Sequence, residues 1–251
     1  MAQDKLILYQ EDSGHQPTPA YVPLKHATLC PVSNINSAEM SNLPAEIQNR
    51  GIDSGAVVLV HTADDRVLLT KRASSLSVFP SLWVPPGGHI EESETVFEAG
   101  FRELAEETGL HLSREDCDSH VLALWESVYP ALLARGLPTR HHIVVYLYTK
   151  VHVPHTELIP MVTMDATEVE AAAWIPRPVI EAIVHGQTPE DAVLPDRFKA
   201  TVFDDRKRQV ETELDATLLL QTIPQTGDDV ERISMGTKFA LSEFLNLTSK
   251  K

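Results

Sequence analysis

Residues 100–110, GFRELAEETGL, place three glutamates and one arginine in a segment that otherwise resembles an ordinary amphipathic helix. Thr95 followed three residues later by Glu98 is a capping box, which predicts that the helix begins at about Val96. Gly109 is typical of a helix C-terminus. Two apolar rows at four-residue spacing give the helix a face that can pack on a core. Packing therefore explains the helix but does not explain its charge.

Three carboxylates share one face of this helix. At about 100° per residue, Glu106 lies about 60° to one side of Glu103, and Glu107 lies about 40° to the other. Like charges at these spacings repel each other, and a divalent cation reverses the sign of that interaction. The alternative is a solvated acidic face. The preceding Gly87 and Gly88 favour the cation, because glycine lets the backbone approach an ion and offers a carbonyl oxygen.

The same residues resemble a complete Nudix box: Gly88, five residues, Glu94, seven residues, and then RELAEETGL from Arg102 to Leu110. So many fixed residues at fixed spacing make a chance match improbable. Membership of this family implies an α/β/α sandwich with a mixed central sheet, in which the box forms a loop, a helix and a loop. It also implies hydrolysis of a nucleoside diphosphate linked to another moiety, with Mg²⁺ or Mn²⁺ as cofactor.

The resemblance also implies roles for the residues of the box. The metal positions fall on the Gly88 carbonyl and on the side chains of Glu103, Glu106 and Glu107. Arg102 and Glu94 fall on the supporting pair, although Arg102 can instead pair with Glu98 one turn back.

The general base is not decided by the box. Glu103 is one candidate, but different Nudix enzymes take the base from different places, including loops outside the box. The outside candidates are Glu126, at a predicted strand end, and Glu168 and Glu170, in the stretch that leads to Trp174. Each of them is otherwise a surface or structural acid.

Substrate phosphates also need positive charge or hydrogen-bond donors from the protein. The local candidates are Lys71, Arg72, His89, Arg140, His141 and His142. The two adjacent histidines enter a predicted strand, so alternation sends them to opposite faces and only one is expected to line the cleft. A single histidine in a strand is otherwise a hydrogen-bonded structural residue.

Segments outside the box resemble one subfamily of the Nudix family. LWVPPGGH, LALWESVYP, GLPTRHHIVVYLY and RISMGTKFAL are similar to the Nudix motif seventeen subfamily, over about residues 55–241. This similarity implies a decapping-type activity on methylated RNA caps, so the expected partner is a nucleotide-derivative substrate, with a capped RNA 5′ end as one candidate. Specificity is set outside the box and stays open. The alternative is a Nudix-fold module that binds a nucleotide or RNA end with weak or no turnover; the intact acids favour the enzyme.

Composition limits the partners and the compartment. The 251 residues carry a net charge of -15, which argues against broad nucleic-acid or anionic-lipid binding because both need excess Lys and Arg. Cys30 and Cys117 have no CxxC partner, so a reducing compartment is expected. The sequence has neither a signal-peptide pattern nor an apolar run of roughly 20 residues. We therefore expect no membrane contact and a cytoplasmic location, with the nucleus as the alternative.

Three parts are predicted along the chain: an N-terminal appendage (1–50), a Nudix domain (51–186) and a small α+β C-terminal extension packed on it (187–251). Apolar, β-branched runs predict strands at AVVLVHT, RVLLTKR, HVLALWESVY, HHIVVYLYTKVHV and EVEAAAWIP, and a second hairpin at ATVFDD and RQVETEL. Helices are predicted at PVIEAIVHG, ending at Gly186, and at TLLLQTI and KFALSEFLN.

Overall fold

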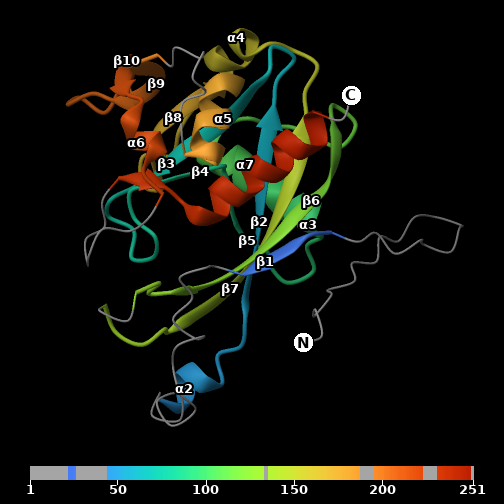
Figure 1. Cartoon of the computed structure of the whole chain (residues 1–251), viewed down its shortest axis with the longest axis vertical. Helices are drawn as coiled ribbons and strands as arrows, with labels where there is room; N and C mark the ends of the chain where they lie inside the picture. Colours follow the sequence, from blue (N-terminus) through green and yellow to red (C-terminus); the bar gives the residue numbers. More distant parts are fainter. Residues whose placement is uncertain (1–21, 27–43, 133–134, 187–194, 223–230, 250–251) are drawn as a thin grey trace, which may run out of the picture.

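One mixed β-sheet organises the protein. A computed structural model describes residues 22–26, 44–132, 135–186, 195–222 and 231–249 (Figure 1). Within them the sheet has the order β1-β6-β7-β2-β3-β8-β9-β10, with β5 paired to β2 and β4 paired to β3 and β11. The strands are β1 (Leu24–His26), β2 (Asp53–His61), β3 (Arg66–Arg72), β4 (Leu82–Val84), β5 (Gly87–His89), β6 (Asp118–Tyr129), β7 (Arg140–Lys150), β8 (Val169–Pro176), β9 (Arg197–Phe203), β10 (Gln209–Asp215) and β11 (Arg232–Ile233).

Helices cover both faces of this sheet. They are α2 (Ala45–Gln48), α3 (Val96–Thr108), α4 (His155–Leu158), η3 (Ile159–Met161), α5 (Arg177–His185), α6 (Thr217–Leu220) and α7 (Met235–Thr248). One core lies between the sheet and α3, and the other between the sheet and the pair α5 and α7. The run Val58 to Val60 is fully buried because both of its faces are covered. The predicted α/β/α sandwich with a mixed central sheet is confirmed.

The C-terminal residues share the sheet and a core with the rest. β9 and β10 continue the sheet past β8, while β11 lies parallel to β4, with Ile233 opposite Trp83. α7 (red in Figure 1) runs across one face of the sheet, and its Phe244 and Leu241 are fully buried against it. The TLLLQTI helix is shorter than predicted, because Gln221 is extended and accepts a hydrogen bond from the Ile233 amide instead.

Two further expectations depend on parts of the chain described only in places. The N-terminal appendage predicted at residues 1–50 lies mainly outside the described residues, apart from β1 and α2. Across the described ranges, no helix combines the length and apolarity needed to cross a bilayer.

Candidate active site

The glutamate helix forms as its sequence predicts. The Thr95 hydroxyl accepts from the Glu98 amide, and the Glu98 carboxylate accepts from the Thr95 amide, which completes the capping box at the start of α3. Gly109 ends the helix with a left-handed φ of 71°. Inside α3, a Cβ on Gly100 would lie 2.8 Å from Leu147 Cδ1. Glycine at residue 100 therefore allows α3 to pack closely on the sheet without displacing the Leu147 side chain.

Arg102 links the acids of the box. Its Nε and Nη2 donate to the two oxygens of Glu94 at 2.7 and 3.0 Å, and Nη2 also donates to the carbonyl of His89. Its Nη1 donates to Glu103 and to Glu106, each at 2.9 Å. The bidentate bond from Arg102 lowers the pKa of Glu94 to about 2. Of the two pairings open for Arg102, the structure has the one that orients the site carboxylates, because the helix-capping glutamate is used elsewhere.

The Glu103 carboxylate packs on the Gly88 backbone. A Cβ on Gly88 would lie 2.3 Å from Glu103 Cδ, so the two can meet only without a side chain at residue 88. Gly88 is held opposite Ala56 in the β5–β2 ladder, and its carbonyl oxygen lies 2.9 Å from where a Cβ of Gly55 would stand. Burial raises the pKa of Glu103, against the opposing effect of Arg102.

Glu107 is the most buried acid of the helix, with 3% of its surface exposed. The Thr70 hydroxyl is a distant donor to its carboxylate, at 3.4 Å. Burial raises the pKa of Glu107 to about 8, although the charge of Arg72 opposes the shift. A buried carboxylate with few donors is unfavourable by itself, and a hard cation beside it would remove that penalty.

The donor chemistry fits a divalent cation, while the side-chain arrangement gathers only part of the predicted set. Glu103 and Glu107 line one cavity together with Glu168, and the three carboxylates repel one another. Glu106, with 57% of its side chain exposed, is ion-paired to Arg102 instead. Among the residues that the structure describes, no three His, Cys, Asp or Glu side chains come together closely enough to hold a metal ion.

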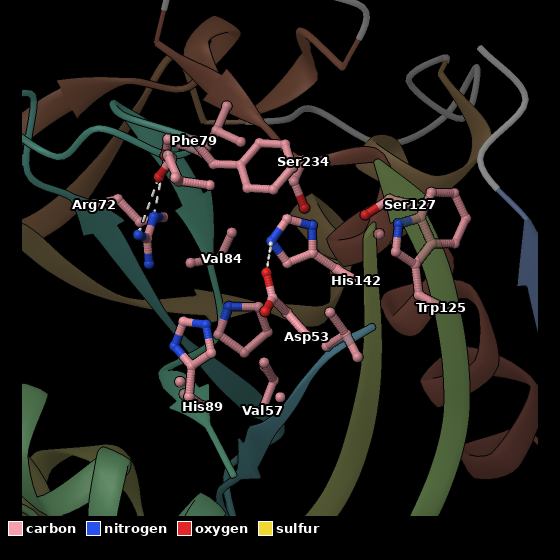
Figure 2. Close-up of a pocket in the computed structure, with 18 of the residues that line it drawn as sticks. Asp53, Val57, Arg72, Phe79, Val84, His89, Trp125, Ser127, His142 and Ser234 are labelled. Carbon is pink, nitrogen blue, oxygen red and sulfur yellow. Dashed lines mark hydrogen bonds and ion pairs between the residues drawn. The ribbon is translucent and has the colours of Figure 1, made fainter. Parts of the chain in front are cut away.

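The cavity has a volume of about 500 Å³, within the range of small-molecule sites. Its walls come from strands β2 to β7 and β11, from α3, from the loop between β3 and β4, from Glu168 before β8, and from the segment that joins β11 to α7. Figure 2 shows the labelled residues converging on it from these elements, with His89 and Val57 near one end and His142 beside Asp53 farther in.

The predicted substrate residues divide into two groups. The group that lines the cavity contains Arg72, His89, Arg140 and His142. The other group faces elsewhere: Lys71 is paired with Glu231 at 2.8 Å and Glu170 at 3.3 Å, and His141 Nε2 lies 2.7 Å from Glu126. Strand alternation separates the two histidines, as their adjacent positions require.

The candidates for the general base that lie outside the box also occupy different places in the structure. Glu126 does not line the cavity; its two oxygens contact His26 and His141, each at 2.7 Å, while its neighbours Trp125 and Ser127 face the cavity. The structure therefore does not bring Glu126 into the cavity that Glu103 and Glu107 line. Glu170 is bound by the Ser74 amide and by Lys71. Glu168 is the outside candidate whose side chain lines the cavity.

Several lining residues carry no signal in the sequence. These are Asp53, Phe79, Ser127, Arg232 and Ser234. Asp53 begins a strand whose apolar pattern starts later, and Phe79 lies in an irregular loop. Arg232 and Ser234 belong to the RISMGTKFAL segment, which the sequence indicates through its similarity to the subfamily.

Comparison with known proteins agrees with this geometry. Residues 52–196 match the model of the NUDIX domain family, more than half of the chain, so the protein belongs to the Nudix family. It is thus a hydrolase acting on phosphoanhydride bonds, and such enzymes generally need a divalent metal.

Three similar relatives share one name. The chain is 43% identical over 232 residues to the m7GpppN-mRNA hydrolase NUDT17 of Danio rerio, covering 89% of this chain and 77% of the relative. It is 40% identical to the protein of that name in Xenopus laevis, covering 90% and 76%, and 39% identical to the one in Homo sapiens, covering 90% and 71%. The predicted similarity to the Nudix motif seventeen subfamily is confirmed.

Proposed function

We propose that this Nudix hydrolase is a Mg²⁺- or Mn²⁺-dependent pyrophosphohydrolase that cleaves the phosphoanhydride chain of 7-methylguanosine-capped RNA. The observation that carries the proposal is the box itself, with Glu103 and Glu107 in one cavity, in a chain about 40% identical to m7GpppN-mRNA hydrolases over nine-tenths of its length. We place the activity in the cytoplasm, with the nucleus as the alternative, since capped RNA occurs in both.

The proposed roles follow from the contacts. Glu103, Glu106 and Glu107, with the Gly88 carbonyl as an additional ligand, would hold the metal, which when bound neutralises phosphate charge and lowers the pKa of a water ligand. Arg102 keeps Glu103 and Glu94 in fixed positions. Arg72, whose charge acts on Glu107, and His89, whose carbonyl accepts from Arg102, line the cavity and are proposed to contact the phosphates. Arg140 lines the opposite end and pairs with Asp53.

We propose Glu168 as the general base. It lines the cavity with Glu103 and Glu107 but sits on the loop before β8, so it can approach a water without being part of the box. Glu168→Gln is expected to lower kcat by about 10²- to 10⁴-fold with little change in KM, because the base acts only in the transition state. Glu126→Gln is the matched comparison and should retain nearly full turnover. The reverse ranking of the two variants would return the role to Glu126.

The function is tested by incubating the purified chain with short capped RNA, dinucleoside polyphosphates, nucleotide sugars, coenzyme A esters and NADH, with each metal, and identifying products by mass. We expect a methylguanosine nucleotide to be released from capped RNA only with metal. Cleavage of another substrate with capped RNA left intact contradicts the proposal. Because the net charge is -15, uncapped RNA should bind weakly, and RNA length should add little affinity.

A second candidate is a Nudix-fold module that binds a nucleotide or RNA end without turnover. The position of Glu106 favours it, because this predicted ligand is 57% exposed, is ion-paired to Arg102 and is not among the residues that line the cavity. Calorimetric titration with a cap analogue distinguishes the two, because binding at full stoichiometry without product at any metal concentration supports the module.

A further inference from the structure

At the end of the cavity away from the box acids, the side chains are ones that the hydrolysis step itself does not need. Asp53, His142 and Phe79 face the same space there (Figure 2). Asp53 and His142 are register partners on β2 and β7. Gly88, against which Glu103 packs, is paired with Ala56, three residues farther along β2. At about 3.3 Å per residue the backbones of Asp53 and Ala56 are about 10 Å apart along β2, roughly the reach of a nucleoside diphosphate.

Asp53 gives this end of the cavity a hydrogen-bond acceptor. Burial raises its pKa, but the hydrogen bond from Arg140 at 3.3 Å and the charge of Arg50 more than offset that effect, so the pKa lies below the ordinary value. The side chain is therefore an anion that only accepts hydrogen bonds. A group that contacts this carboxylate directly must therefore carry a hydrogen-bond donor.

His142 supplies a second acceptor. Its Nδ1 is buried and has no hydrogen-bond partner within the described residues. Burial lowers the pKa of His142 to about 4, so the ring is neutral and has one donor and one acceptor nitrogen. Its Nε2 lies 3.8 Å from the Asp53 carboxylate, which favours the proton on Nε2. Nδ1 is then an acceptor that lacks a donor.

Phe79 supplies an aromatic wall in a constrained backbone. Its φ of 52° is uncommon for a residue other than glycine. Arg72 holds the loop in this conformation by donating to the carbonyls of Phe79 at 3.0 Å and Val78 at 3.2 Å. The ring centroid lies 5.6 Å from that of His142. An aromatic side chain kept in such a position at a cavity wall suits a planar ligand.

We propose that Asp53, His142 and Phe79 form a base subsite that selects guanine. Guanine presents two neighbouring donors, N1–H and the N2 amino group, on the edge that two acceptors can read, whereas adenine presents a donor beside an acceptor. Methylation at N7 adds positive charge to the ring, which the Asp53 anion also favours. The inference rests on the proposed phosphoanhydride hydrolysis and names the part of the substrate that is recognised.

The test compares the dinucleotides GpppG and ApppA as substrates of the full chain, and GDP and ADP as ligands in calorimetry. We expect the wild type to prefer GpppG by about ten- to a hundredfold in kcat/KM. Asp53→Asn should raise KM for GpppG by a similar factor and leave ApppA nearly unchanged. His142→Phe, which keeps the ring but removes the orphan nitrogen, should shift discrimination in the same direction.

The controls are Asp118→Asn and His152→Phe, whose side chains are 77% and 67% exposed at the far end of β6 and after β7. Both should behave as wild type. Equal use of GpppG and ApppA by the wild type, or an equal loss on both in Asp53→Asn, overturns the guanine assignment. If Asp53→Asn unfolds at a lower temperature than the wild type, the guanine assignment is judged from His142→Phe instead. If nothing is hydrolysed, the proposed function fails, while GDP binding no tighter than ADP separately overturns the subsite.

Discussion

Replacing Glu107 with glutamine is expected to abolish hydrolysis and to leave the protein at least as stable as before. Glu107 is 3% exposed, and a buried carboxylate is costly, whereas glutamine has the same shape without the charge. A metal-holding carboxylate contributes several kcal/mol of transition-state stabilisation, so kcat should fall at least about a thousandfold. Thermal unfolding and metal-dependent product release, measured on the same preparation, check both parts.

The double variant Glu106→Gln with Glu107→Gln should lose turnover completely, because both proposed ligands are neutralised. Glu98→Gln is the matched control on the same helix, since glutamine can replace glutamate in the capping box. It is expected to keep full activity. Wild-type turnover in the double variant would refute the metal assignment, and a large drop in unfolding temperature in Glu107→Gln would make this acid structural.

Alanine variants of the two glycines before the helix are expected to have different effects: one should lower activity, and the other should lower stability. In Gly88→Ala the new methyl group would stand 2.3 Å from Glu103 Cδ, the end of a flexible side chain that can move. The fold should survive with the carboxylate displaced, and a misplacement of about 1 Å lowers the rate by about 10²-fold. Kinetics and circular dichroism of the same sample test this.

Gly87→Ala is the comparison, because its methyl group would stand 2.3 Å from the Ala56 carbonyl and 2.5 Å from Val57 Cα. Backbone atoms in a paired strand cannot move aside without separating β5 from β2, so unfolding free energy should fall by about 3 kcal/mol or more. If both variants are equally unstable, or if Gly88→Ala retains full activity, the packing of Glu103 on Gly88 does not contribute to catalysis.

Glu126 shows what strand periodicity leaves undecided. It lies near the end of β6, in agreement with the strand predicted from the sequence. Trp125 and Ser127 line the cavity, so alternation places Glu126 on the other side, where His26 and His141 bind it. Strand periodicity predicts that successive side chains point to opposite faces. It does not predict which face borders a cavity whose other walls come from distant segments.

The sequence by itself determined the glutamate helix, its capping box, its glycine C-terminus and the acids that share one of its faces. These features depend on contacts within about four residues, so local spacing is enough to specify them. The family follows from the same run of residues.

Only the tertiary structure decided which groups meet in the cavity. Glu168, Asp53 and Ser234 arrive from a loop, a strand start and the C-terminal segment, and their meeting depends on strand order and on the packing of α7 across the sheet. Such contacts join residues far apart in the chain. Their geometry is set by the burial of both sheet faces, which no local pattern of spacing or charge encodes.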